Sequence, residues 1–217
     1  LSPNISFVGG AWKWTGFIPH NRYSIHACKA VIQACVEHRI NEITFACWGD
    51  DGAESSLFAV LPTLFVNANE VYGNHMSNKC FEVLTGISLD TFLSVDEVNP
   101  CMRDGFTHNN ASKYFLYNDL LQGTFDSVAQ ASMIREIQSI LPKISNKSIE
   151  SSDLFYYFKT VQSLIKVLEL KLNLGNEIYH AYKHNDLQAF NKIVDQILPE
   201  LIKRIETFYN AFKKQWY

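Results

Sequence analysis

Two short apolar runs near the start of the chain are each followed by residues with helical spacing. Residues 5–8 and 43–48 are rich in β-branched and aromatic side chains, and the second run is continuous, as in a strand buried on both faces of a parallel sheet. Behind each run, apolar residues recur three and four positions apart along one helical face. A strand followed by a helix, twice over, is typical of a (β/α) barrel or a doubly wound sheet.

The limits of these elements follow from the same pattern. We expect parallel strands near residues 5–11 and 42–48, and helices near 23–39 and 54–72. Pro62 lies inside the second helical stripe and predicts a kink there, because proline removes a backbone hydrogen bond.

Strand patterns stop near residue 75. A short helix is expected at 77–85, closed by Gly86, and another around 111–118. Between them, residues 88–111 look irregular and polar.

Three longer helical stripes complete the chain. They cover residues 128–141, ending at Pro142, then 158–172 and 190–212, and residues 145–152 form a loop by composition. The predicted fold is therefore mainly α with a small parallel β part. Two βα units occupy residues 1–75, and an α-helical bundle occupies 76–217.

Composition excludes several classes of protein. Of the 217 residues, 47% are hydrophobic and 19% are charged, with a net charge of −3. A sizeable core is thus expected, and a disordered chain or a nucleic-acid-binding surface is not. No apolar run approaches the roughly 18 residues of a membrane span. The chain also opens without Met, directly into a strand-like segment, which predicts a domain cut open upstream.

The five cysteines form no CxxC pair. We interpret them as free buried thiols of a reducing, cytoplasmic compartment rather than as zinc ligands. His180 and His184 stand four apart, but no third metal ligand accompanies them, so neither a metal nor a cofactor is expected.

Aromatic and acidic residues gather after both predicted strands. Trp12 and Trp14 follow the first strand, and Trp48 and Asp50 end the second. An indole ring can cover the apolar face of a sugar while a carboxylate accepts hydrogen bonds from its hydroxyls. We therefore expect these four residues to bind a carbohydrate.

Structural roles remain open for residues in the same segments. Asp51 with Glu54 three positions later has the form of a helix N-cap, and the tryptophans could be plain core. His20, Arg22 and Tyr23 follow the first loop as ligands or as solvated residues.

Two motifs carry a resemblance to a known family. Gly-Gly-Ala-Trp-Lys-Trp-Thr-Gly-Phe at 9–17 and Ala-Cys-Trp-Gly-Asp-Asp-Gly-Ala-Glu at 46–54 resemble a bacterial branch of the family 20 glycoside hydrolases. Members of that branch are exo-acting β-N-acetylhexosaminidases with a helical C-terminal region. Residues 58–62, 116–119 and 123–126 also look like that branch.

The resemblance implies a fold, a mechanism and roles for particular residues. The family fold is a (β/α)₈ barrel, so residues 1–75 would be its last two βα units. The acetamido oxygen of the substrate attacks C1 in this family, which is an exception to the two-carboxylate scheme. Trp48 and either Trp12 or Trp14 would wall the acetamido group, and Asp50 would bind distal hydroxyls, where Glu is more common.

In this family the catalytic Asp-Glu pair stands in a Gly-Gly-Asp-Glu setting, and no such motif occurs in this sequence. The resemblance therefore implies an inactive C-terminal fragment with no catalytic residue of its own, from an enzyme that acts on N-acetylhexosamine-terminated glycans. Two alternatives stay open. One is a non-catalytic helical interaction module whose N-terminal segment docks on a partner, and the other is a carbohydrate-binding protein. Association into a homo-oligomer also stays open.

Overall fold

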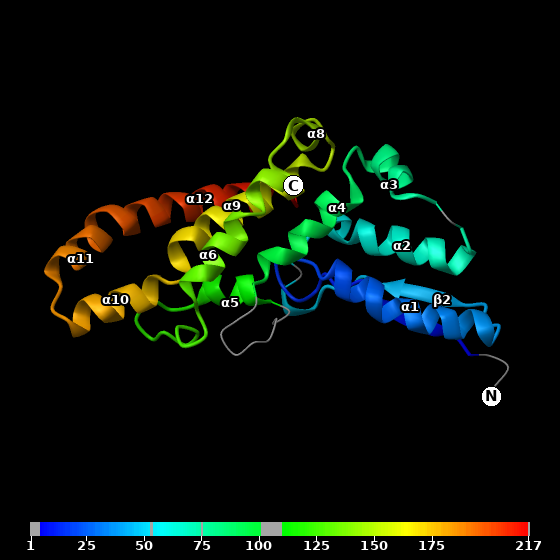
Figure 1. Cartoon of the computed structure of the whole chain (residues 1–217), viewed down its shortest axis with the longest axis horizontal. Helices are drawn as coiled ribbons and strands as arrows, with labels where there is room; N and C mark the ends of the chain where they lie inside the picture. The colour runs from blue at the N-terminus through cyan, green and yellow to red at the C-terminus, as the bar shows by residue number, and fades with distance from the viewer. Residues whose placement is uncertain (1–4, 53, 75, 101–109, 217) are drawn as a thin grey trace. The chain divides into compact units, whose positions relative to one another are not determined.

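The computed structural model describes residues 5–52, 54–74, 76–100 and 110–216. It divides into two compact units, shown with their helices and strands in Figure 1. The first unit consists of Leu1–Asp96 with Lys147–Leu154, and the second of Glu97–Asn146 with Phe155–Tyr217. The boundary that we expect after residue 75, between barrel units and helical domain, stays a prediction.

The first unit contains a two-stranded parallel sheet among its described residues. Strand β1 (Phe7–Gly10) pairs with β2 (Ile43–Ala46), in a register that places Phe7 opposite Ile43 and Gly10 opposite Ala46. The parallel pairing confirms the prediction from the two apolar runs, although each strand is shorter than expected. A parallel pair requires a crossover connection, which helix α1 (Asn21–Glu37) supplies.

Helices α1 and α2 (Leu61–Tyr72) pack side by side in this unit (Figure 1). The inner face of α1 buries Cys28, Ile32 and Cys35. The predicted helix 54–72 with a kink at Pro62 is wrong at its start. Ser56 instead caps a 3₁₀ turn, Leu57–Val60, and Pro62 lies in the first turn of α2, where its missing N–H leaves no bond unmade.

The rest of the first unit is more helical than its composition indicates. Helix α3 (Asn78–Thr85) ends at Gly86 in a left-handed conformation, as predicted. The expected irregular stretch 88–111 is wrong over α4 (Leu89–Leu93) and the 3₁₀ turn Ser94–Val98, since Phe92, Leu93 and Val95 are buried core. Helix α8 (Lys147–Glu150) likewise replaces the loop expected at 145–152.

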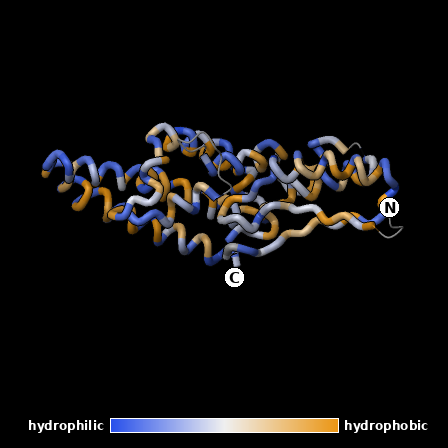
Figure 2. The backbone as a smooth tube through the Cα atoms, turned by 90° about the horizontal axis from the view of Figure 1, so that it is seen from below, coloured by the Kyte–Doolittle hydropathy of each residue, from blue (hydrophilic) through white to orange (hydrophobic). Residues whose placement is uncertain are grey.

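A central helix organises the second unit. Helix α9 (Phe155–Lys171) buries residues on several sides, among them Phe158, Leu164 and Leu168, as a helix surrounded by others should. The helices that contact it are α5 (Ala111–Tyr117), α6 (Ala131–Gln138), α7 (Leu141–Ile144), α10 (Leu174–Lys183) and α12 (Leu198–Lys214). Figure 2 shows hydrophobic and hydrophilic positions alternating along the helices, the mark of amphipathic packing.

Prolines divide two of the three long predicted helices. Pro142 does not end its stripe but lies in the first turn of α7, after α6 has stopped at Gln138. The third stripe splits into α11 (Leu187–Lys192), a π-helical turn at Ile193–Ile197 and α12. Pro199 lies in the first turn of α12, directly after the π-helical turn. Because proline has no N–H, it cannot donate the backbone hydrogen bond that an uninterrupted α-helix would make at this position.

The cysteines and the length of the apolar helices were also predicted from the sequence. Cys28 and Cys35 are free and buried, as expected, whereas Cys47 and Cys80 are free but only half-buried, so the prediction of buried thiols is wrong for these two. Cys101 lies outside the described residues. In the part of the chain that the structure describes, no helix combines the length and the apolar character needed to cross a membrane.

Candidate functional site

Three tryptophans meet at one edge of the small sheet. Both strands point the same way, and the backbone N–H of Ala11 donates to the carbonyl of Ala46 at 2.9 Å, which aligns the two strand ends. The ring centroids of Trp12 and Trp14 are 5.0 Å apart, and those of Trp14 and Trp48 are also 5.0 Å apart. The structure thus brings together the three aromatic residues singled out in the sequence.

The loop that carries two of these rings is tied down at both ends. The N–H of Trp12 donates to Ser24 Oγ at 2.9 Å, and Ser24 Oγ donates to the carbonyl of His20 at 2.7 Å. The N–H of His20 donates in turn to the carbonyl of Trp12 at 2.8 Å. One buried serine on α1 therefore anchors the start and the end of the loop.

Glycine at position 10 makes room for the aromatic rings. A Cβ at Gly10 would lie 2.7 Å from Cη2 of Trp14 and 3.1 Å from Cδ1 of Trp12. Both distances are tighter than ordinary carbon contacts, so the indoles cover the glycine backbone directly.

Tyr23 extends the cluster from the first turn of α1. Its ring centroid is 4.5 Å from that of Trp12, and the side chain is 52% exposed. The sequence offered Tyr23 as one of several loop residues without preference. In the structure, the first turn of α1 lies against the loop and places the Tyr23 ring on Trp12, which could not be read from the sequence.

Lys13 is a member of the site that the sequence reasoning did not single out. Its side chain is 5% exposed, and burial lowers the pKa of its ammonium group below the usual value. Cys47 and the carboxylate of Glu54 oppose this effect and raise that pKa. The sequence could have indicated this burial, because Lys13 stands between two tryptophans. In an extended segment alternate side chains point to opposite sides, so Lys13 points away from the side that carries both rings.

Asp50 and Glu54, at the two ends of the acidic part of the second motif, differ in their exposure to solvent. Asp50 is exposed, at the start of a 3₁₀ turn that runs to Gly52, and its predicted role in binding hydroxyls stays a prediction. Glu54 is half-buried, and its Oε1 lies 2.7 Å from where a Cβ of Gly52 would stand. The N-cap interpretation of Asp51 depends on its side chain and on residue 53, which lie outside the described residues, so it stays a prediction.

His180 and His184 stand four apart on α10 and its C-terminal end, where a metal site would need at least one further ligand. The rings of His180 and His184 stack with centroids 6.3 Å apart. Across the described residues, no group of three or more His, Cys, Asp or Glu side chains is arranged to hold a metal ion.

A family model matches the second part of the chain. It describes the glycoside hydrolase 20C C-terminal domain and aligns with residues 90–217, which is more than half of the sequence. The chain belongs to this glycoside hydrolase 20C family. The match supports a glycosidase parent and a hexosaminidase-related role. A search of the curated proteins gave no match.

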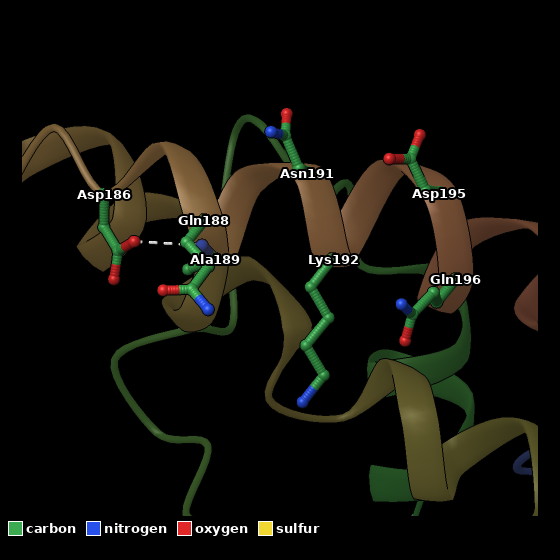
Figure 3. A pocket seen from close by; sticks show the side chains of 7 residues that line it. All are labelled: Asp186, Gln188, Ala189, Asn191, Lys192, Asp195 and Gln196. Atoms are coloured by element: carbon green, nitrogen blue, oxygen red, sulfur yellow. Dashed lines mark hydrogen bonds between the residues drawn. The ribbon is translucent and has the colours of Figure 1, made fainter.

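The aligned part of this family 20C chain holds all of the helical second unit and not the tryptophan cluster. One shallow hollow of about 470 Å³ runs along α11 and the π-helical turn (Figure 3). Its polar side chains, Asp186 to Gln196, all come from one helical stretch and fan outward along it, so they do not converge on a ligand. In addition, Asp186 is occupied as the N-cap of α11, accepting from the N–H of Ala189 at 2.9 Å.

Proposed function

We propose that this chain is the C-terminal portion of a β-N-acetylhexosaminidase that removes terminal N-acetylhexosamine from glycans. The observation that carries the proposal is the contact between Trp14 and Trp48 at the common end of two parallel strands, in a chain with a family 20C domain. The two βα units would then be the last of a (β/α)₈ barrel, whose active sites lie at the strand carboxyl ends.

The chemistry of such an enzyme gives each site residue a distinct role. The acetamido oxygen of the substrate forms a bond to C1 while the bond from C1 to the leaving oxygen breaks, and water later opens the cyclic intermediate. Trp12, Trp14 and Trp48 would hold the acetamido group against C1 and exclude water. Asp50 would accept hydrogen bonds from hydroxyls remote from the breaking bond.

We assign no residue of this chain as the acid that protonates the leaving oxygen. The Gly-Gly-Asp-Glu motif that holds the acid in family 20 does not occur in the sequence, so we propose that another part of the parent protein supplies it. The isolated chain should therefore not turn over substrate, since general acid–base help alone is typically worth about 10²–10⁴-fold.

The test compares the full-length parent with the 217-residue chain. The parent should release chromophore from an aryl N-acetyl-β-hexosaminide and not from the matching aryl β-glucoside, which lacks the acetamido nucleophile. Replacing the N-acetyl group by N-trifluoroacetyl should slow the parent, because fluorine withdraws electrons from the attacking oxygen. A parent that cleaves both aryl glycosides equally well would overturn the proposal, and so would turnover by the isolated chain.

A further inference from the structure

The second unit contains a hollow of about 420 Å³ that the proposed catalytic role does not use. One wall is the loop at residues 120–126, and the opposite wall is the face of α10 that carries Gly175, Ile178, Tyr179 and Tyr182. Phe190 of α11 adds a third side. Three separate elements thus converge on one space, unlike the shallow hollow of Figure 3.

A carboxylate contributes to the lining of this hollow. Asp126 Oδ1 accepts a hydrogen bond from Asn118 Nδ2 at 2.7 Å, which fixes its position. Glycines on both walls let it fit. A Cβ at Gly175 would lie 2.8 Å from Asp126 Cγ, and one at Gly123 would lie 2.6 Å from Oδ2. Asn176 adds an amide, whose Nδ2 donates to the carbonyl of Asp126 at 3.0 Å.

The rim of the hollow is aromatic and exposed. Tyr179 is 56% exposed and Tyr182 is 73% exposed, on the α10 face that lines the hollow, and Leu121 stands 87% exposed on the loop. Lys183 Nζ lies 5.8 Å from the ring centroid of Tyr179 and supports that ring from the other end of the helix turn. Large rings left in water beside fixed polar groups are typical of a binding surface.

We propose that this hollow is a second, non-catalytic binding site for a neutral sugar residue. Tyrosine rings would cover the C–H face of the pyranose, and the Asp126 carboxylate would accept hydrogen bonds from the hydroxyls. A phosphorylated ligand would gain no net attraction, because the nearby Lys171 ammonium already interacts with Asp119 and Asp126. An apolar protein segment would have to strip water from that carboxylate, which costs free energy without a compensating bond. The proposal stands apart from the catalytic one, since every residue of this hollow belongs to the second unit.

The experiment titrates the 217-residue chain with N,N′-diacetylchitobiose and follows binding by saturation-transfer NMR and calorimetry. Tyr182→Ala and Asp126→Asn should each weaken binding at this site by tenfold or more, while Trp48→Ala should leave that site unchanged. Tyr209 offers a matched control for Tyr179. Tyr209 is 57% exposed and has Lys213 Nζ 5.4 Å from its ring, but it lies outside the hollow. Tyr179→Ala should therefore weaken binding, and Tyr209→Ala should not.

Three results would overturn the proposal. Binding that is lost in Trp48→Ala and kept in Tyr182→Ala would place the sugar in the first unit only. Absence of binding by a chain whose circular dichroism shows it folded would leave no sugar site. A dimer in sedimentation that Tyr182→Ala dissociates, without sugar binding, would make the hollow a protein-docking face. Since the tyrosines are exposed and Asp126→Asn keeps the acceptor for Asn118, these variants should fold.

Discussion

Trp14 and Trp48 pack edge to face, with ring centroids 5.0 Å apart and an interplanar angle of 66°. The contact joins the loop after β1 to the end of β2, so it exists only because the two strands run parallel in one register. Trp48 is 48% exposed, which leaves one side of its ring available to a ligand.

Replacing Trp48 by Ala in the full-length parent should lower kcat as well as raise KM. If the indole presses the acetamido group toward C1, its contact tightens as the new ring closes, and such an interaction lowers the barrier itself. Steady-state kinetics on an aryl N-acetyl-β-hexosaminide measures both constants. An unchanged kcat would mean that Trp48 is not a wall of the pocket.

Asp50→Ala provides the contrasting variant. A carboxylate that holds hydroxyls remote from the breaking bond should contribute equally to substrate and transition state, so most of its effect should appear in KM. A loss confined to kcat would contradict this assignment.

Substituting Gly10 by Ala should disturb the tryptophan cluster without touching a tryptophan. The new Cβ would stand 2.7 Å from Cη2 of Trp14, so at least one ring must move, and overpacking of this kind typically costs about 1–3 kcal/mol. Near-UV circular dichroism should lose intensity from the coupled indoles, and urea denaturation should show the lower stability. An unaltered spectrum would show that the rings do not lie over this glycine in solution.

Asp96 should make stability fall as the pH rises between about 4 and 6. Its carboxylate accepts from the N–H of Arg22 at 2.7 Å and from Asn21 Nδ2 at 3.4 Å, but burial dominates and raises its pKa from 3.8 to about 6. The native state thus holds this proton more tightly than the unfolded chain. The resulting stabilisation is complete when the pH is below the pKa of Asp96 in the unfolded chain. It is lost as the pH rises through the higher pKa of Asp96 in the native state.

The matched variant for this prediction is Asp96→Asn, which does not titrate. The difference in free energy of unfolding, wild type minus Asp96→Asn, should decrease by up to about 3 kcal/mol from pH 4 to pH 7. Taking the difference removes the other carboxylates from the comparison. A constant or rising difference would contradict the raised pKa of Asp96.

Two carboxylates that bind the same arginine should contribute different amounts to the free energy of unfolding. Arg204 on α12 donates through Nη1 to Glu169 Oε2 on α9 at 2.8 Å and through Nε to Glu200 Oε1 at 2.9 Å. The Glu169 side chain is 17% exposed and that of Glu200 is 46% exposed. Glu169→Gln should cost about 1–3 kcal/mol of unfolding free energy, because the guanidinium loses the negative charge of its more buried partner. Glu200→Gln should stay within experimental error, since exposed pairs contribute little, and equal losses would refute the distinction.

Local chemistry in the sequence determined many of the elements. Apolar runs gave the two strands and their parallel order, Gly86 marked the end of α3, and helical stripes predicted α1, α5 and α9. Each of these signals acts within a few residues, through backbone conformation or through the period of one buried face. The family resemblance also rested on two such local motifs, and the match over residues 90–217 confirms the family.

Tertiary packing decided the rest. Residues 89–98 look polar and irregular in sequence, yet they fold into α4 and a 3₁₀ turn because Phe92 and Val95 find a buried surface to pack on. Pro62 and Pro142 start helices instead of kinking or ending them, since a proline in a first turn loses no hydrogen bond. The burial of Lys13, the packing of Tyr23 on Trp12 and the hollow around Asp126 emerged only from the fold. Their neighbours lie far away in sequence, and burial and proximity are properties of the packed chain that no local pattern encodes.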